Sequence, residues 1–235
     1  MASIKFPIEI IKGAPVFRNN GNIILLDTGA PKTIHTSTEL DFLDKNFTVI
    51  TTYGSINMQT ISGNMDTPIT TLLGMDILKD YKIIFDYKNL EISILTGDDE
   101  DFKGEEIPMI NHLGIPVIEV APADKYIPMF LDSGAHLSYV KNIHTQYHKN
   151  CGETEDFHPT IGKFTTTKFL SCSRIGEHYI DVYYGNLPAQ LSVYVSLING
   201  DNGILGYDFF AKFKMCLDMK NNKLTLMEGM RYDYK

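Results

Sequence analysis

The sequence contains no tryptophan, only three cysteines and fewer basic than acidic residues, and each shortage narrows the class of protein. The three cysteines are an odd number without a CxxC pair, which argues against a disulfide framework or a zinc knuckle. The 21 basic against 29 acidic residues give a net charge of -8, which argues against a nucleic-acid binder. No apolar run is long enough to span a membrane.

The remaining composition is that of a globular protein. The 235 residues are 43% hydrophobic, which allows one large domain or two small ones with real cores. The first residues alternate between apolar and polar types and include Glu9, unlike the apolar region of a signal peptide. We therefore expect a cytoplasmic protein that acts as a monomer, without membrane or nucleic-acid partners.

A six-residue motif occurs twice in the chain. Leu25-Leu26-Asp27-Thr28-Gly29-Ala30 is repeated as Phe130-Leu131-Asp132-Ser133-Gly134-Ala135. Upstream, Gly13-Ala14-Pro15-Val16 matches Gly114-Ile115-Pro116-Val117, and downstream Leu73-Gly74-Met75-Asp76 matches Leu205-Gly206-Tyr207-Asp208. Because these matches follow one another in the same order, we predict two similar structural units.

The secondary-structure signals are mainly those of β-strands. Asn20-Gly21 lies between two apolar runs and predicts a tight hairpin. Short helices are expected at Asp76–Tyr81 and Asp208–Phe213, each with its first aspartate as the cap. Strands are expected at Pro15–Phe17, Asn22–Leu26, Thr48–Tyr53, Ile83–Asp86, Leu90–Leu95, Val117–Val120, Ile127–Leu131, Tyr179–Tyr184, Leu191–Val195 and Lys223–Met227.

An acidic, glycine-containing segment separates the two units. We interpret residues 97–108 as a solvated linker rather than a cation site. The predicted organisation is an N-terminal lobe over residues 1–96 and a C-terminal lobe over residues 109–235. The predicted fold class is all-β with a few short helices.

The two equivalent aspartates predict a symmetric site. If the two units pack about a pseudo-twofold axis, Asp27 and Asp132 meet there. Two adjacent carboxylates do not both ionise readily, so the pair shares a proton and titrates as a unit. One carboxylate can then deprotonate a water while the other polarises a substrate carbonyl, which hydrolyses an amide without metal or cofactor.

The neighbouring residues fit this chemistry. Gly29 and Gly134 allow backbone N–H groups to approach the carboxylates. Thr28 and Ser133 provide hydroxyls that can join the two loops and fix the site.

Asp-Thr/Ser-Gly-Ala after an apolar strand, with a later glycine after an apolar pair, resembles the aspartic peptidases of the pepsin and retropepsin superfamily. The resemblance covers nearly the whole chain, and it looks closest to bacterial retropepsin-like proteins with two lobes in one chain. It implies a bilobal acid-protease-like β-barrel fold with pseudo-twofold symmetry and a cleft between the lobes.

The resemblance also implies the activity and the residue roles. The expected protein is an aspartic endopeptidase that acts on a peptide or protein substrate, with Asp27 and Asp132 as the catalytic pair. Thr28 and Ser133 would form a hydroxyl grip between the lobes. Gly74 and Gly206 would lie in the psi-loops behind the catalytic turns.

One departure from the family pattern, found in both copies of the motif, alters the expectation. Pepsins have serine where this chain has Ala30 and Ala135, and that hydroxyl stabilises the ionised aspartate. Its loss makes the pair less acidic, so we expect activity nearer neutral pH. His136, which follows Ala135, is a candidate to line the cleft, and a loop histidine without a role is the alternative.

The flap that would cover the cleft has two candidates. Asp27 and Gly74 are 47 residues apart, whereas Asp132 and Gly206 are 74 apart. The N-terminal lobe (lobe one) is therefore shorter than the C-terminal lobe (lobe two) between its aspartate and its glycine. Tyr53-Gly54 resembles a flap tip in lobe one, and Phe157–Phe164 is an alternative covering loop in lobe two.

Two other functions are alternatives to peptide hydrolysis. A catalytically weak or inactive peptide-binding or regulatory module would retain the same fold. Glycoside hydrolysis by the two carboxylates is disfavoured, because the chain has no tryptophan for sugar stacking and an axial pair would lie too close together.

Overall fold

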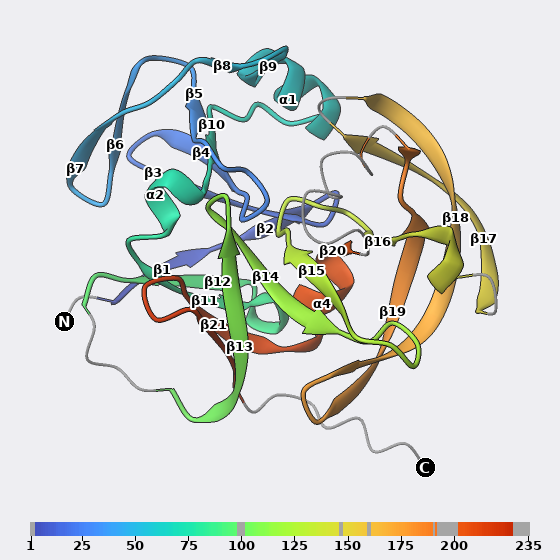
Figure 1. Cartoon of the computed structure of the whole chain (residues 1–235). Coiled ribbons are helices and arrows are strands. Elements are labelled where there is room, and N and C mark those ends of the chain that lie inside the picture. Colours follow the sequence, from blue (N-terminus) through green and yellow to red (C-terminus); the bar gives the residue numbers. More distant parts are fainter. Residues whose placement is uncertain are drawn as a thin grey trace.

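The computed structural model describes residues 3–97, 102–145, 148–158, 161–189, 191 and 202–227. The chain is mostly β and forms two lobes, which confirms the predicted fold class. Figure 1 shows strands β5 to β9 and helix α1 of lobe one at the top, β13, β19 and β21 of lobe two lower down, and the β17–β18 hairpin of lobe two at the right, where it rises to the level of α1.

Six antiparallel strands form the part of a 13-stranded sheet that both lobes share. Its order is β1 (Ser3–Pro7), β12 (Glu91–Leu95), β11 (Lys82–Asp86), β21 (Lys214–Asp218), β22 (Lys223–Met227) and β13 (Gly104–His112). Each half of the chain supplies three strands, and β11 pairs with its counterpart β21 at the centre. The equivalent strands therefore meet about a pseudo-twofold axis.

Two ion pairs repeat this symmetry across the lobe junction. Lys82 Nζ lies 3.5 Å from an oxygen of Asp218, and Lys214 Nζ lies 2.9 Å from an oxygen of Asp86. Each pair joins a lysine of one central strand to an aspartate of the other. The contact is thus reciprocal, as expected for an interface between similar halves.

Lobe one is built on a second, five-stranded sheet. Its order is β2 (Glu9–Ile11), β3 (Ala14–Asn19), β4 (Asn22–Leu26), β10 (Thr71–Leu73) and β5 (Ile34–His35). Two small hairpins, β6 (Glu39–Phe42) with β7 (Lys45–Thr48) and β8 (Thr52–Tyr53) with β9 (Ile56–Asn57), precede α1 (Met58–Met65). Helix α2 (Met75–Leu78) follows β10, and the 3-10 helix η1 (Tyr87–Asn89) follows β11.

Lobe two repeats this arrangement and extends it. Its sheet continues from β13 through β14 (Ile115–Val120), β15 (Ile127–Leu131), β20 (Gly203–Leu205), β16 (Ser138–Val140), β19 (His178–Asn186), β18 (Gly162–Ile175) and β17 (Lys149–His158). Helix α4 (Tyr207–Lys212) follows β20, and η2 (Asn142–His144) follows β16. Strands β17 and β18 form a long hairpin that has no counterpart among the short hairpins of lobe one.

The largest hydrophobic core contains residues of both lobes. Phe85 of β11 and Phe210 of α4 lie with ring centroids 5.0 Å apart, and Phe210 also stacks on Tyr87. A smaller core of lobe one includes Val16, Leu25 and Leu72. Because the main core continues through the junction, the two lobes pack as one body.

Several local predictions are confirmed. The β3–β4 hairpin turns at Asn20-Gly21, both with positive φ, as a tight two-residue turn requires. Both short helices occur where they were predicted: α4 begins and ends one residue before the predicted bounds, and α2 begins one residue and ends three residues before them.

Other local predictions are corrected. Asp76 and Asp208 do not cap their helices, since the cap positions are Gly74 and Gly206. Asp76 instead accepts bonds from the N–H and hydroxyl of Thr33. The strand predicted at Thr48–Tyr53 is interrupted between β7 and β8. Helix α1 and the β17–β18 hairpin were not predicted.

Two predicted segments extend beyond the described residues. Positions 192–195 of the predicted Leu191–Val195 strand and positions 98–101 of the predicted linker lie outside them. At the other end of the predicted linker, residues 104–108 belong to strand β13 and pair with β22.

Candidate active site

The two aspartates follow equivalent strands of the two lobes. Asp27 comes directly after β4 and Asp132 directly after β15. Their backbone N–H groups donate to the carbonyls of Leu73 and Leu205, each at 3.0 Å. These carbonyls end the parallel partner strands β10 and β20, so each aspartate lies at the carboxyl end of a parallel strand pair.

The two aspartate loops face one another across the lobe junction. A Cβ atom added to Gly29 would lie 2.3 Å from Cγ of Asp132. A Cβ on Gly134 would lie 2.7 Å from Cγ of Asp27. Each carboxyl group therefore packs against the glycine of the other motif, at a distance that only glycine permits.

Backbone amides and burial determine the charge state of the pair. Gly29 N–H donates to Asp27 Oδ1 and Gly134 N–H donates to Asp132 Oδ1, both at 2.9 Å. Burial raises the pKa of Asp27 above its usual value, and these backbone bonds oppose the rise. Burial together with the nearby charge of Asp27 raises the pKa of Asp132 well above its usual range. Because both pKa values are raised and the two groups interact, the arrangement favours one proton shared by the pair.

Four buried hydrogen bonds join the two loops. Thr28 N–H donates to Ser133 Oγ at 3.0 Å, and Ser133 N–H donates to Thr28 Oγ1 at 2.9 Å. In turn, the Thr28 hydroxyl donates to the carbonyl of Leu131 and the Ser133 hydroxyl to that of Leu26. Because both side chains are fully buried, this reciprocal network fixes the spacing of the carboxylates.

The psi-loop glycines pack directly against the motif loops. A Cβ on Gly74 would lie 2.8 Å from the carbonyl oxygen of Ala30, and one on Gly206 would lie 2.7 Å from that of Ala135. The same two carbonyls accept hydrogen bonds from the N–H groups of Met75 and Tyr207. The start of each short helix thus supports the loop that holds an aspartate.

The remaining predicted site residues lie in different places. His136 is exposed, and its Cα would be 2.9 Å from a Cβ on Gly13, so it borders lobe one. Tyr53 and Gly54 lie at the turn between β8 and β9, where Tyr53 is 49% exposed and Gly54 has no neighbour within 4 Å of its Cβ position. A substrate contact by Tyr53 or Gly54 stays a prediction.

The structure adds residues that the sequence did not single out. Tyr87 is buried, and burial and the charges of Tyr207, Asp132 and Asp27 raise the pKa of its phenol, which is neutral. Tyr139, seven residues after Asp132, donates a hydrogen bond to Asp156 of β17. The repeat gave no signal for either residue, because Met219 and Ile34 stand at the equivalent positions.

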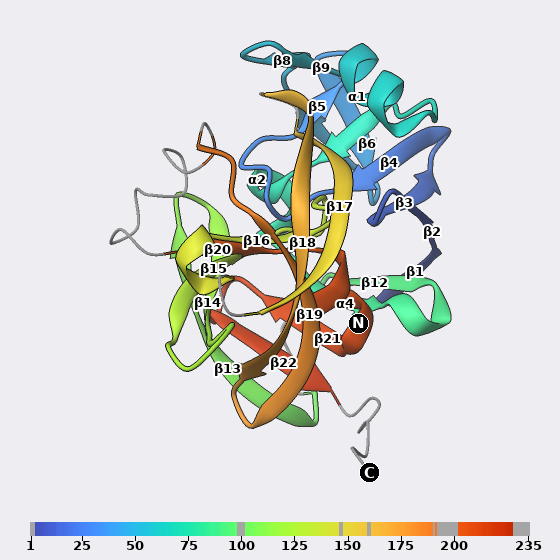
Figure 2. The same cartoon turned by 90° about the vertical axis from the view of Figure 1, so that its right-hand side faces the viewer.

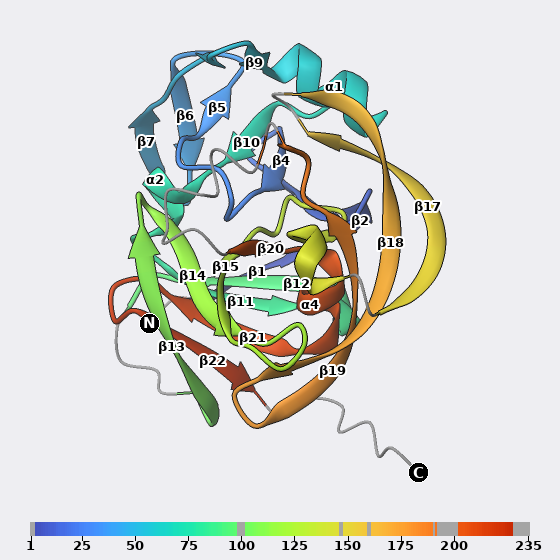
Figure 3. The same ribbon diagram turned by 45° about the vertical axis from the view of Figure 1, so that its right-hand side comes forward.

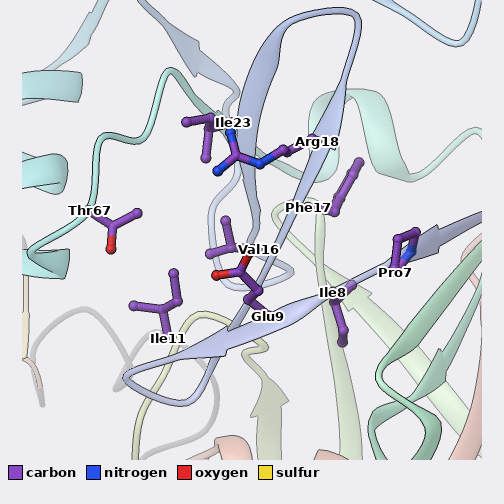
Figure 4. A pocket seen from close by; sticks show the side chains of 9 residues that line it. All are labelled: Pro7, Ile8, Glu9, Ile11, Val16, Phe17, Arg18, Ile23 and Thr67. Atoms are coloured by element: carbon purple, nitrogen blue, oxygen red, sulfur yellow. The ribbon is translucent and has the colours of Figure 1, made fainter.

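A surface pocket lies elsewhere in lobe one. Figure 4 shows that its lining includes the charged Glu9 and Arg18 together with apolar side chains of the first strands. Thr67 completes its lining, and none of the predicted site residues takes part. The pocket is therefore separate from the paired aspartates.

Comparison with solved structures identifies the type of fold. The chain is similar to an aspartic proteinase from Irpex lacteus, with a TM-score of 0.53 over 99% of both chains and 12% sequence identity. This likeness shows a pepsin-like bilobal fold. No family model and no curated protein sequence matches the chain.

Within the described part of the chain, no helix is long and apolar enough to cross a membrane.

Proposed function

We propose that this protein is an aspartic endopeptidase whose catalytic pair is Asp27 and Asp132. The observation that supports this most directly is the reciprocal packing of each carboxyl group against the glycine of the other motif. Fixed by the Thr28–Ser133 network and partly buried, the pair has the geometry of two carboxylates that share one proton.

The reaction follows from the two charge states. Ionised Asp27 takes a proton from a water held between the carboxylates, and the water oxygen attacks the carbonyl carbon of the peptide bond. Asp132 gives its proton to the carbonyl oxygen, which forms a neutral tetrahedral intermediate. Proton transfer from Asp27 to the amide nitrogen then allows the C–N bond to break, and Asp132 recovers its proton from the collapsing intermediate.

The proposal includes the setting of the enzyme. All three cysteines are free thiols, which supports a reducing compartment such as the cytoplasm. Ala30 and Ala135 support a retropepsin-like enzyme, and the size and the two lobes in one chain support the bacterial type. The continuous core between the lobes supports a single-chain monomer. Its substrates would be peptides or proteins.

Single substitutions of the pair test the function. We expect Asp27→Asn and Asp132→Asn each to reduce hydrolysis of a diverse peptide library by about 10²-fold to 10⁴-fold, because each removes one acid–base group. The matched control is Asp80→Asn, which changes an exposed aspartate and should leave turnover unchanged. Circular dichroism of all three variants verifies the fold.

The outcomes distinguish an active peptidase from an inactive peptide-binding module. Near wild-type turnover in either site variant would contradict the dyad mechanism. Absence of hydrolysis by the wild type, with retained calorimetric binding of pepstatin, would instead identify an inactive peptide-binding module.

A further inference from the structure

The two lobes differ most in the segment between the aspartate and the psi-loop glycine. In lobe one this segment forms two small hairpins and helix α1. In lobe two it contains the β17–β18 hairpin, which pairs from Lys149 with Leu170 to His158 with Gly162. The symmetric site therefore has a long extension on one side only.

This hairpin is joined to the loop that contains Asp132. Tyr139 of β16 follows that loop, and its hydroxyl donates a hydrogen bond to the carboxylate of Asp156 on β17. The Tyr139 ring also lies 6.0 Å, between centroids, from the ring of Phe164 on β18. Since Tyr139 is 4% exposed, both arms of the hairpin rest on a buried side chain that is continuous with the active-site loop.

Glycine at position 185 makes this contact possible. A Cβ there would lie 2.6 Å from a ring carbon of Tyr139 and 3.0 Å from the Thr166 methyl group. Thr166 in turn accepts a hydrogen bond from Asn186 N–H at 3.0 Å. The Tyr139 ring is thus enclosed by β18 and β19, which limits the positions that the hairpin can take.

The other end of the hairpin reaches lobe one. Figure 2 shows β17 and β18 rising from β19 to the level of α1, and Figure 3 shows the same course from another side. Lys163 of β18 is close enough for its positive charge to help lower the pKa of Asp66, although the hydrogen bond from Lys12 is the larger cause. The Lys12–Asp66 ion pair is 2.7 Å long.

These lobe-one residues lead back to the active site. Lys12 precedes Gly13 in the β2–β3 turn, and a Cβ on Gly13 would meet the backbone and ring of His136. His136 lies four residues after Asp132 in the same loop. The end of α1, the β2–β3 turn and the loop of Asp132 are therefore linked by contacts, and Lys163 of the hairpin lies near this group.

We propose that the β17–β18 hairpin of lobe two is the cover that holds peptide substrates over Asp27 and Asp132, and that Tyr139 is the residue that positions it. The proposal rests on the proposed peptidase function and deepens it. Lobe one contributes the exposed Asp66 near Lys163 of the hairpin, and Lys12 pairs with Asp66. Tyr139 acts through Asp156 and Phe164, so it is a positioning residue rather than a catalytic one.

Steady-state kinetics tests the role of Tyr139. Tyr139→Phe keeps the ring and removes the hydroxyl bond to Asp156, so we expect KM for peptides to rise about tenfold while kcat changes little. Asp156→Asn should act in the same direction. The matched control is Tyr184→Phe, which removes a buried tyrosine hydroxyl that bonds Ser173 at 2.8 Å in the same sheet and should leave KM unchanged.

Hydrogen exchange tests the cover itself. Pepstatin binding to the wild-type chain should slow amide exchange in residues 153–158 and 163–168, whereas residues 170–175 at the base of the hairpin should not change. Protection should be weaker in Tyr139→Phe than in Tyr184→Phe.

Each outcome has one meaning. Suppose that the wild type hydrolyses peptides or binds pepstatin, but the hairpin is not protected and KM is equal in the two tyrosine variants. The proposed role of the hairpin is then wrong, and the proposed peptidase function is unaffected. Binding and hairpin protection without turnover support the cover and reject the peptidase. A wild type that neither binds nor hydrolyses overturns both.

Discussion

At the residue scale, the same side chain has different chemistry in different surroundings. Asp80 is exposed, Asp76 accepts two bonds from Thr33, and Asp27 and Asp132 share a partly buried site. In that shared site burial raises the pKa of both members of the pair. The motif supplies the carboxylates, and we propose that their environment makes one of them an acid and the other a base.

The pH dependence of turnover follows from these shifts. The active form has one proton on the pair, so kcat/KM falls when Asp27 is also protonated at low pH and when Asp132 loses its proton at high pH. Because both pKa values are raised, we expect a bell-shaped profile that extends toward neutral pH.

Serine variants provide the control for this profile. Ala30→Ser and Ala135→Ser restore a hydroxyl that stabilises the ionised aspartate, so the acid limb should move to lower pH. A sharp wild-type optimum below about pH 3 would contradict the assignment.

At the element scale, parallel strand pairs and short helices fix the two aspartate loops. Strands β10 and β20 bind the backbone of the aspartates, and helices α2 and α4 begin with N–H groups that bind Ala30 and Ala135. Because Gly74 and Gly206 lie at these contacts, their lack of a side chain determines how closely each helix approaches its loop.

Alanine substitutions measure this close approach. A Cβ on Gly74 would lie 2.7 Å from the Lys32 carbonyl group, so Gly74→Ala should lower the free energy of unfolding by about 2 kcal/mol or more. Gly63→Ala in α1 has open space and should instead raise it by about 0.5–1 kcal/mol. Urea unfolding of both variants measures the difference, and equal effects would reject the packing explanation.

At the scale of the whole molecule, the shared six-stranded sheet holds the two aspartates at one axis. Strands β11 and β21 pair at its centre, and the reciprocal ion pairs lie at either end of their contact. Lys82 and Asp218 are 5% and 2% exposed. The attraction between the two charges therefore offsets the free-energy cost of removing each of them from water.

Removal of one partner of the buried ion pair should therefore lower the stability of the protein. Lys82→Met leaves the buried Asp218 carboxylate without its cation, and we expect a loss of about 3–5 kcal/mol in the free energy of unfolding. Lys5→Met breaks the exposed pair with Glu91 and should cost less than about 1 kcal/mol. Guanidinium titration compares them, and Lys82→Met/Asp218→Leu should recover most of the loss.

Much of the fold and of the site was predictable from the sequence. Two copies of one motif, with the same glycine landmarks in the same order, predicted two similar lobes and named the residues that the structure brings together. The Asn20-Gly21 turn and both short helices were predictable because turn chemistry and apolar spacing are local properties. Helix α1 was missed because it includes Gly63 and the weak helix formers Thr60, Ser62 and Asn64.

Only the tertiary structure decided which contacts these residues make. Asp76 satisfies a local rule for helix caps, yet it bonds Thr33, which is 43 residues away. The extra length of lobe two was visible in the sequence, but its polar, weakly alternating residues did not predict the β17–β18 hairpin. The sequence by itself determined two lobes and two aspartates, because repetition and local propensity are written along the chain. The proton sharing that we propose for the aspartates, the hydrogen bonds between Thr28 and Ser133, and the position of the hairpin end near lobe one depend on residues far apart in sequence. The distances between such residues are determined only when the chain folds.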